Sequence, residues 1–449
     1  MRKLILFVAV MMVLLSSQNI QAQWNEVGGL NGLAANGPIK TMCSDPAGNI
    51  YAAGGFRNDS GKFYVAKWDG NSWSELGGMN GIKAYDTINS ICSDAQGNIY
   101  AGLDYGVGGG GLPNVYVAKW NGNQWSFIYT GGSEYCCTIN TLSCDIQGNV
   151  YAMGDFFQTM TGHFIAKWDG NNWSKIWFNH TGFPYYFYSS CSDHFGNIYI
   201  AGSYANSSFL ALLNSGNINS FGPPPGHEHY GSEIFSICSD TSGNLYAGGI
   251  FTNGSNLNNG HYYVAKGNGT TWTELGGKDA LAANHPIRSV FRDGLGRIFA
   301  AGDFTNSSGN NYVAKFDGIS WRELGGNNSL AANNTIRTIC TDTAGNIYLA
   351  GDFTNANGKQ YVAVLSKSLG INETPTSSIS ISPNPTTSSI TIKGITEPTI
   401  AVYNLMGEKV VDSKGSNEVN LAQLPAGMYL VQVFNKDMEL VKSEKVIKE

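Results

Sequence analysis

Residues 345–353, GNIYLAGDF, decide the fold because near-copies of this stretch recur along the chain. The seven copies lie 47 to 53 residues apart and begin at Gly48, Gly97, Gly148, Gly196, Gly243, Gly296 and Gly345. A repeat of roughly 40 to 50 residues built from short strand-like runs is typical of a β-propeller with one four-stranded blade per repeat. We therefore predict an all-β chain whose main part is a seven-bladed β-propeller.

The sixth repeat shows how one blade is built. Strand-like runs lie at residues 287–293, 297–304, 312–316 and 320–324. An Asp-x-x-Gly turn separates the first two runs, with Asp able to cap backbone N–H groups and Gly able to adopt a positive φ. We interpret the acids that recur there as turn residues: Asp45, Asp94, Asp145, Asp193, Asp240, Asp293 and Asp342.

The two ends of the repeat region complement each other. The seventh repeat stops after its third strand, whereas WNEVGG at residues 24–29 matches WRELGG at residues 321–326 of the sixth repeat. We predict that the N-terminal strand is the outermost strand of the seventh blade. This pairing would close the ring and leave no open edge.

Composition and segment character set the domain limits. Residues 1–22 have the charged start, apolar core and small-residue end of a signal peptide, and no later segment is long enough to span a membrane. A net charge of -6 with 13% charged residues argues against a nucleic-acid partner. We assign residues 23–365 to the propeller, 366–376 to a linker and 377–449 to a small immunoglobulin-like β-sandwich.

The cysteines follow the repeat. Five of them precede a repeat glycine by five residues, namely Cys43, Cys92, Cys191, Cys238 and Cys340. Phe291 takes this position in the sixth repeat, and Ser143 takes it in the third, with Cys144 beside it. A position that accepts Cys or Phe is an apolar packing site, and equivalent positions of adjacent blades are expected to be too far apart for a disulfide. Cys136 and Cys137 lie outside the series and are left as candidates for a disulfide.

One face of the propeller carries the sequence variation. The first-to-second and third-to-fourth connections are uniform, so they belong to a constant face. The connections on the other face are nearly identical between blades 5, 6 and 7, where LAAN recurs at residues 281–284 and 330–333. They differ at residues 105–111, 177–188 and 222–230 of blades 2 to 4. We expect any binding on this variable loop face.

A second variable set lines the inner strands, eight residues before each repeat glycine. Its members are Lys40, Asn89, Asn140, Tyr188, Phe235, Arg288 and Arg337. In a ring they would form a cationic arc that faces an aromatic arc, an arrangement suited to an anionic or polar sugar. The alternative is that these side chains simply pack between blades. With the loop aromatics, the candidate ligand-binding residues are Lys40, Trp177, Tyr185, Tyr186, Tyr188, Phe235, Arg288 and Arg337.

No cofactor or metal site is predicted. The HEH sequence at residues 227–229 lacks a third ligand, and the glycines at 106–111 lack the Lys and Ser/Thr of a phosphate loop. The acids Asp104, Asp155, Asp303 and Asp352 recur with the repeat, so we interpret them as structural. The arginines and Tyr188 loosely resemble the site of sialidase-type propellers, but the Asp box of those enzymes is missing. Binding is therefore favoured over catalysis.

The C-terminal segment carries four landmarks in order. They are SPNPT at residues 382–386, VYNLMGEKV at 402–410, LPAGMYLV at 424–431 and KVIK at 445–448. This segment resembles the type A sorting domain of the type IX secretion system of Bacteroidota. The resemblance implies passage across the outer membrane by the type IX machinery, followed by release or attachment to surface lipopolysaccharide.

The repeats, with AKWDGNSW at residues 66–73 as the clearest copy, resemble the WDG-x-x-W propellers of secreted bacterial proteins. We expect an exported, secreted or surface-attached binding and adhesion propeller with a glycan or surface-protein ligand. The alternatives are a polysaccharide-active hydrolase or lyase that uses the same face, and a purely structural surface protein. Ligand identity, oligomeric state and the choice between release and anchoring stay open at this point.

Overall fold

The structure is a computed structural model. It describes residues 23–449 except 30–31, 83, 104–115, 130–137, 155–156, 159–161, 178–184, 205–206, 215, 222–230, 269–270, 367–378, 405–408 and 437–439. The chain divides into two compact units, Met1–Lys367 and Ser368–Glu449. The predicted signal peptide and nearly all of the predicted linker lie outside the described residues.

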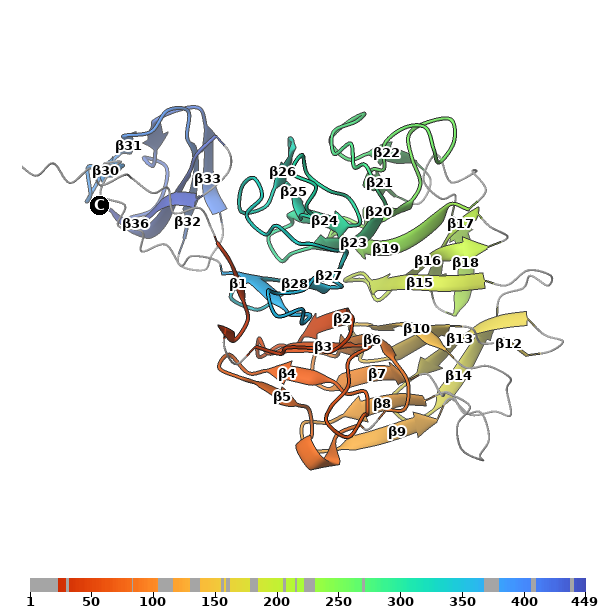
Figure 1. Ribbon diagram of the computed structural model, residues 1–449. Coiled ribbons are helices and arrows are strands. Elements are labelled where there is room, and N and C mark those ends of the chain that lie inside the picture. Colours follow the sequence, from red (N-terminus) through yellow and green to blue (C-terminus); the bar gives the residue numbers. More distant parts are fainter. Residues whose placement is uncertain are drawn as a thin grey trace, which may run out of the picture. The chain divides into compact units, whose positions relative to one another are not determined.

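The first unit contains seven antiparallel sheets, each with four main strands (Figure 1). Blade 1 is β2 (Ile39–Ser44), β3 (Ile50–Gly54), β4 (Ala66–Trp68) and β5 (Trp73–Glu75), and a 3-10 turn, Gly78–Asn80, follows it. Blade 2 is β6 (Ile88–Ser93), β7 (Ile99–Leu103), β8 (Tyr116–Trp120) and β9 (Trp125–Tyr129). Blade 3 is β10 (Ile139–Cys144), β11 (Val150–Gly154), β13 (Gly162–Trp168) and β14 (Trp173–Trp177), and the short β12 (Phe157–Gln158) also pairs with β13.

The remaining blades repeat this order. Blade 4 is β15 (Tyr185–Ser192), β16 (Ile198–Tyr204), β17 (Ser207–Asn214) and β18 (Asn217–Phe221). Blade 5 is β19 (Glu233–Ser239), β20 (Leu245–Ile250), β21 (Ala265–Gly267) and β22 (Trp272–Glu274). Blade 6 is β23 (Ile287–Arg292), β24 (Ile298–Gly302), β25 (Ala314–Phe316) and β26 (Trp321–Glu323). Blade 7 is β27 (Ile336–Thr341), β28 (Ile347–Gly351), β29 (Ala363–Leu365) and β1 (Trp24–Glu26).

The blades form a closed ring. The innermost strands β2, β6, β10, β15, β19, β23 and β27 each contact the next, and β27 contacts β2. The N-terminal strand β1 pairs with β29, with Trp24 opposite Leu365 and Glu26 opposite Ala363. Both the seven-bladed propeller and its closure by the N-terminal strand are therefore confirmed.

Hydroxyl side chains join adjacent blades near the axis. Ser90 Oγ accepts a hydrogen bond from the Leu142 N–H at 2.9 Å, and Ser236 Oγ accepts one from the Val290 N–H at 2.9 Å. Thr41 and Ser189 do the same for the blades that follow them. In four of the seven blades, the Ser or Thr that stands seven residues before the repeat glycine thus satisfies a backbone N–H of the neighbouring blade.

The recurring aspartates act as turn residues, as predicted. Asp45 Oδ1 accepts from the N–H groups of Ala47 and Asn49, both at 2.9 Å. Its Oδ2 accepts from Asn49 Nδ2 at 2.7 Å and from the Tyr51 hydroxyl at 2.8 Å. The same Asp, Asn and Tyr set recurs in five other blades.

The second unit is a β-sandwich, as predicted. One sheet has the order β30 (Ser380–Ser382), β31 (Ser389–Lys393), β34 (Glu418–Asn420). The other has the order β33 (Lys409–Lys414), β32 (Thr399–Tyr403), β35 (Gly427–Phe434), β36 (Leu440–Lys448). Buried residues of both sheets form one core, which includes Ile390, Ile400, Val419 and Val431.

Candidate functional site

A β-bulge positions the inner-ring candidates. In blade 1, Ile39 pairs with Gly54 and Thr41 pairs with Ala53, so Lys40 is an extra residue without a partner in the ladder. The other six blades shift register at the corresponding residue. Bulges re-aim side chains and are common beside functional sites. Lys40, Tyr188, Phe235, Arg288 and Arg337 all occupy this position.

The glycine of the repeated stretch makes the bulge sterically feasible. A Cβ placed on Gly302 would lie 2.4 Å from Pro286 O and 2.7 Å from Arg288 N. The same position is glycine in five further blades, whereas blade 2 has Leu103. In the six blades with glycine a Cβ would clash with the strand opposite, and only glycine lacks that atom. Blade 2 forms the same bulge opposite Leu103, so its backbone accommodates a side chain there.

Three bulge side chains from adjacent blades contact one another. The rings of Tyr188 on β15 and Phe235 on β19 lie 5.5 Å apart at 68°. The guanidinium of Arg288 on β23 lies 4.4 Å from the centre of the Phe235 ring. The Tyr188 hydroxyl donates to Glu233 Oε1 at 3.1 Å. These side chains form one continuous surface, which we call the blade 4–6 surface.

The two arginines are ion-paired. Arg288 donates through Nε and Nη2 to Asp303 Oδ2 at 2.8 and 2.7 Å. Arg337 forms two parallel bonds to Asp352, at 2.7 and 2.6 Å, and this partner raises the pKa of the guanidinium. Asp303 also accepts from Thr335 Oγ1 at 2.7 Å. The two arginines of the expected cationic arc are thus each neutralised by an aspartate, which was not predicted.

The cationic set of blades 6, 7 and 1 adjoins the aromatic set of blades 4 and 5 where Arg288 stacks on Phe235. Lys40, at the other end of the cationic set, is exposed, and its Nζ donates to Asn89 Oδ1 of blade 2 at 2.9 Å.

The loop aromatics are placed less uniformly. Trp177 lies on β14, the outermost strand of blade 3, where its ring is 5.1 Å from Phe164. It packs on its own blade and does not join the blade 4–6 surface. Tyr186 is 45% exposed at the start of β15. The side chain of Tyr185 lies outside the described residues, as do residues 178–184 and the HEH sequence at 227–229.

Burial controls the ionisation of this surface. Desolvation raises the pKa of Tyr188 to about 12, and the charge of Glu233 adds to the shift. Burial also raises the pKa of Glu233, although the bond from Tyr188 and the charge of Arg288 oppose this. Tyr188 therefore stays a neutral hydrogen-bond donor near pH 7.

Sequence reasoning missed Glu233, Thr335 and the arginine partners. Asp303 and Asp352 follow the glycine opposite the bulge in blades 6 and 7. However, Asp104 and Asp155 occupy the same position in blades 2 and 3, where the bulge residues are Asn89 and Asn140. The recurring acid alone therefore does not predict an arginine partner.

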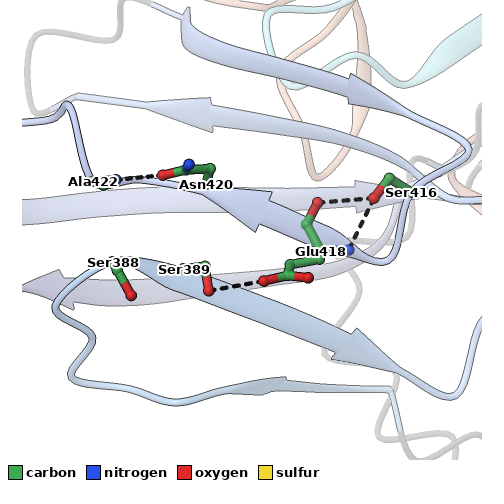
Figure 2. A pocket seen from close by; sticks show the side chains of 6 residues that line it. All are labelled: Ser388, Ser389, Ser416, Glu418, Asn420 and Ala422. Atoms are coloured by element: carbon green, nitrogen blue, oxygen red, sulfur yellow. Dashed lines mark hydrogen bonds between the residues drawn. The ribbon is translucent and has the colours of Figure 1, made fainter.

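A shallow polar hollow of about 410 Å³ lies on the second unit (Figure 2). Ser389 Oγ donates to Glu418 Oε1 at 3.1 Å, and Asn420 Oδ1 accepts from the Ala422 N–H at 2.8 Å. These polar groups thus bond within the module.

Among the described residues, no group of three or more His, Cys, Asp and Glu side chains could hold a metal ion. No helix in the described part is long and apolar enough to cross a membrane.

Two landmarks of the second unit meet in space. Asn384 of the SPNPT sequence donates through Nδ2 to Lys445 O at 2.7 Å and accepts from the Ile447 N–H at 3.0 Å. Thr386 N–H also donates to Ile447 O at 2.8 Å. The first landmark is therefore held against the last strand, β36, by hydrogen bonds.

Residues 380–449 match the model of the secretion system C-terminal sorting domain family. The second unit is thus a type IX secretion sorting domain. The chain is exported to the cell surface or secreted, and its sorting domain engages the type IX machinery. The search of curated proteins found no match.

The chain resembles several solved structures. The extracellular domain of BT3049 from B. thetaiotaomicron, described as a hybrid two-component system, is 12% identical to this chain, with a TM-score of 0.52. The match covers 95% of this chain and 57% of that one. The chain is 13% identical to PorZ of Porphyromonas gingivalis, a surface component of the type IX system, with a TM-score of 0.48 and coverages of 93% and 59%. YCF48 from Cyanidioschyzon merolae is 12% identical, with a TM-score of 0.47 and coverages of 76% and 98%. The chain thus spans less than two thirds of the first two proteins. At these identities the likeness concerns the fold alone.

Proposed function

We propose that this exported propeller is a binding or adhesion module that takes a carbohydrate on the blade 4–6 surface. The observation that carries the proposal is the contact of Tyr188, Phe235 and Arg288, three bulge residues from three blades. Side chains that vary from blade to blade on a uniform scaffold are a common basis of recognition.

The contacts favour a polar, uncharged sugar. Aromatic rings offer an apolar face to the C–H side of a sugar ring, while guanidinium and hydroxyl groups bond its hydroxyls. Asp303 and Asp352 offset the charges of the two arginines, and Glu233 adds a carboxylate. We therefore favour a neutral sugar over the anionic one that the sequence also allowed.

One contact favours the hydrolase alternative. The bond between Tyr188 and Glu233 brings a phenol and a carboxylate together, as a tyrosine nucleophile and its base would require. However, the pKa of Tyr188 is raised to about 12, which opposes nucleophile formation. The arginines are also held by Asp303 and Asp352, so binding is the better account.

A glycan-array screen of the full chain tests the proposal. We expect a defined set of neutral glycans to bind, and Phe235→Ala to abolish the signal. The matched control is Phe195→Ala, since Phe195 is 66% exposed on an Asp-x-x-Gly turn of the constant face. Absence of glycan binding, or equal loss in both variants, would leave protein adhesion or a structural role as the function.

A further inference from the structure

Two cysteine sulfurs meet across one blade interface. Cys92 Sγ on β6 and Cys144 Sγ on β10 lie 2.9 Å apart, although the residues are 52 positions apart in the chain. This separation is shorter than the roughly 3.5–4.0 Å at which non-bonded heavy atoms attract best. The two thiols are therefore in direct contact.

The register of Cys144 explains why this pair meets. In the third repeat Ser143 occupies the usual cysteine position and Cys144 follows it. Successive side chains of a strand point to opposite faces, so the one-residue shift turns the sulfur the other way. Cys191 and Cys238 occupy equivalent positions in blades 4 and 5, and within the described residues their sulfurs make no such contact. The sequence analysis compared only equivalent positions and so did not consider Cys144.

The same interface departs from its neighbours in a second way. At four other interfaces a tryptophan indole donates to a backbone carbonyl of the preceding blade, as Trp125 Nε1 does to Leu76 O at 3.0 Å. Trp173 is its counterpart in blade 3, and its buried Nε1 has no partner among the described residues. Ile128, which replaces Leu76, is paired with Val117 inside the longer strand β9.

We propose that Cys92 and Cys144 form a disulfide that links blades 2 and 3 in the exported protein. An S–S bond replaces two S–H bonds, and the two protons and two electrons pass to the disulfide of an envelope dithiol oxidoreductase, which becomes a dithiol. Export takes the chain to a compartment where disulfides persist. The bond would covalently join the interface at which the indole bond is absent.

Burial limits the reactivity of the Cys92 thiol in the folded chain. The neighbouring Cys144 thiol and desolvation raise the pKa of the Cys92 thiol well above its usual value. Thiolate is the attacking species in disulfide exchange, so Cys92 supplies little attacking thiolate once blades 2 and 3 are folded.

Peptide mapping of the full chain, secreted by a type IX-competent host and collected without reductant, tests the proposal. The protein is unfolded, alkylated, digested and analysed by mass spectrometry. We expect a cross-linked peptide pair that contains Cys92 and Cys144, with Cys191 and Cys238 alkylated. Alkylation of both Cys92 and Cys144, or a bond from either to Cys136 or Cys137, would overturn the proposal.

Two serine variants provide the controls. Cys144→Ser should lose the cross-link and leave Cys92 fully alkylated, whereas Cys238→Ser should keep it. Reductant should lower the melting temperature of the wild type and of Cys238→Ser by several degrees, and leave that of Cys144→Ser unchanged. An equal effect of reductant on all three proteins would contradict a stabilising Cys92–Cys144 bond.

Discussion

The propeller has two regions that have similar inner strands and different outer ones. We call blades 5, 6, 7 and 1 the regular region and blades 2, 3 and 4 the irregular region. In the regular region the fourth strand has three residues, whereas β9, β14 and β18 have five. After the short strand a Leu-Gly-Gly or Val-Gly-Gly turn follows, and Gly77 and Gly325 have φ values of 90° and 85°. This turn presents the Leu76 or Leu324 carbonyl to the next blade's tryptophan.

The loop face differs between the two regions in the same way. Glu75 on β5 accepts from Asn58 Nδ2 at 3.0 Å, and Glu26, Glu274 and Glu323 bond their own loop asparagines. Asn333 of the LAAN sequence accepts from the Thr354 N–H at 2.9 Å. In the regular region, polar side chains of the loops therefore form hydrogen bonds within their own blade. The sequence variation lies instead in the loops of blades 2 to 4 and at the bulge residues.

Substitution of the glycine that lies opposite the bulge should have the largest effect on stability, and it should do so in both regions. Gly351→Ala in blade 7 would place Cβ 2.2 Å from Thr335 O, and Gly202→Ala in blade 4 would place it 1.7 Å from Tyr186 O. We expect each to lower the free energy of unfolding by about 3 kcal/mol, measured in urea.

The control for these variants is Gly122→Ala. Gly122 has a φ of 93°, but its Cβ would meet nothing within 4 Å. We expect a loss of about 1 kcal/mol from backbone strain alone. If Gly202→Ala costs no more than this control, the bulge is not equally constrained in the irregular region.

Loss of ligand affinity should be the next largest effect and should lie at the border of the two regions. Arg288→Met removes the group stacked on Phe235, so we expect binding of a glycan identified by the array to weaken about tenfold, or about 1.4 kcal/mol. Arg337→Met is the matched variant, because Arg337 is also paired with an aspartate but, among the described residues, does not stack on Phe235 or Tyr188. Calorimetric titration should show a smaller loss for Arg337→Met. Equal losses would extend the site into blade 7.

Two tryptophan variants sharpen the comparison further. Trp125→Phe removes the donor to Leu76 O, whereas Trp173→Phe removes a buried donor without a described partner. Both remove similar volume, so the cost of Trp125→Phe should exceed that of Trp173→Phe by about 1 kcal/mol in urea unfolding. Equal costs would mean that the indole bond does not distinguish the regions.

Repeat spacing, turn chemistry and the matching WNEVGG and WRELGG sequences were sufficient to predict the ring, its closure and the Asp turns. The ion pairs of Arg288 and Arg337 were not predicted, because a bulge shifts the alternation of side chains by one residue. Cys144 was missed for a related reason, since its offset from the repeat changes the face of the strand. Contacts across blades also depend on side-chain direction, which periodicity alone does not give.

The last effect appears only at alkaline pH and concerns the turn tyrosines. The Tyr199 hydroxyl of blade 4 donates to Asp193 Oδ2 at 3.3 Å, and burial, with Asp193, raises the pKa of Tyr199 to about 12. The phenol of the unfolded chain has a pKa of about 10. From about pH 10 to about pH 12 the unfolded state therefore releases a proton that the folded state keeps, so stability falls as pH rises.

Tyr199→Phe should remove this contribution and make the decline in unfolding free energy between about pH 10 and about pH 12 shallower by at most one proton. Blade 6 already carries Phe299 at the equivalent position, so the turn tolerates the change. Tyr85→Phe is the control, since Tyr85 is 70% exposed and bonds no turn aspartate. The bond of Tyr51 to Asp45 is shorter, at 2.8 Å, and burial raises the pKa of Tyr51 further. Tyr51→Phe should therefore flatten the decline at least as much as Tyr199→Phe. If only Tyr199→Phe flattens the decline, the turn tyrosines of the two regions differ in pKa although the turns are built from the same residues.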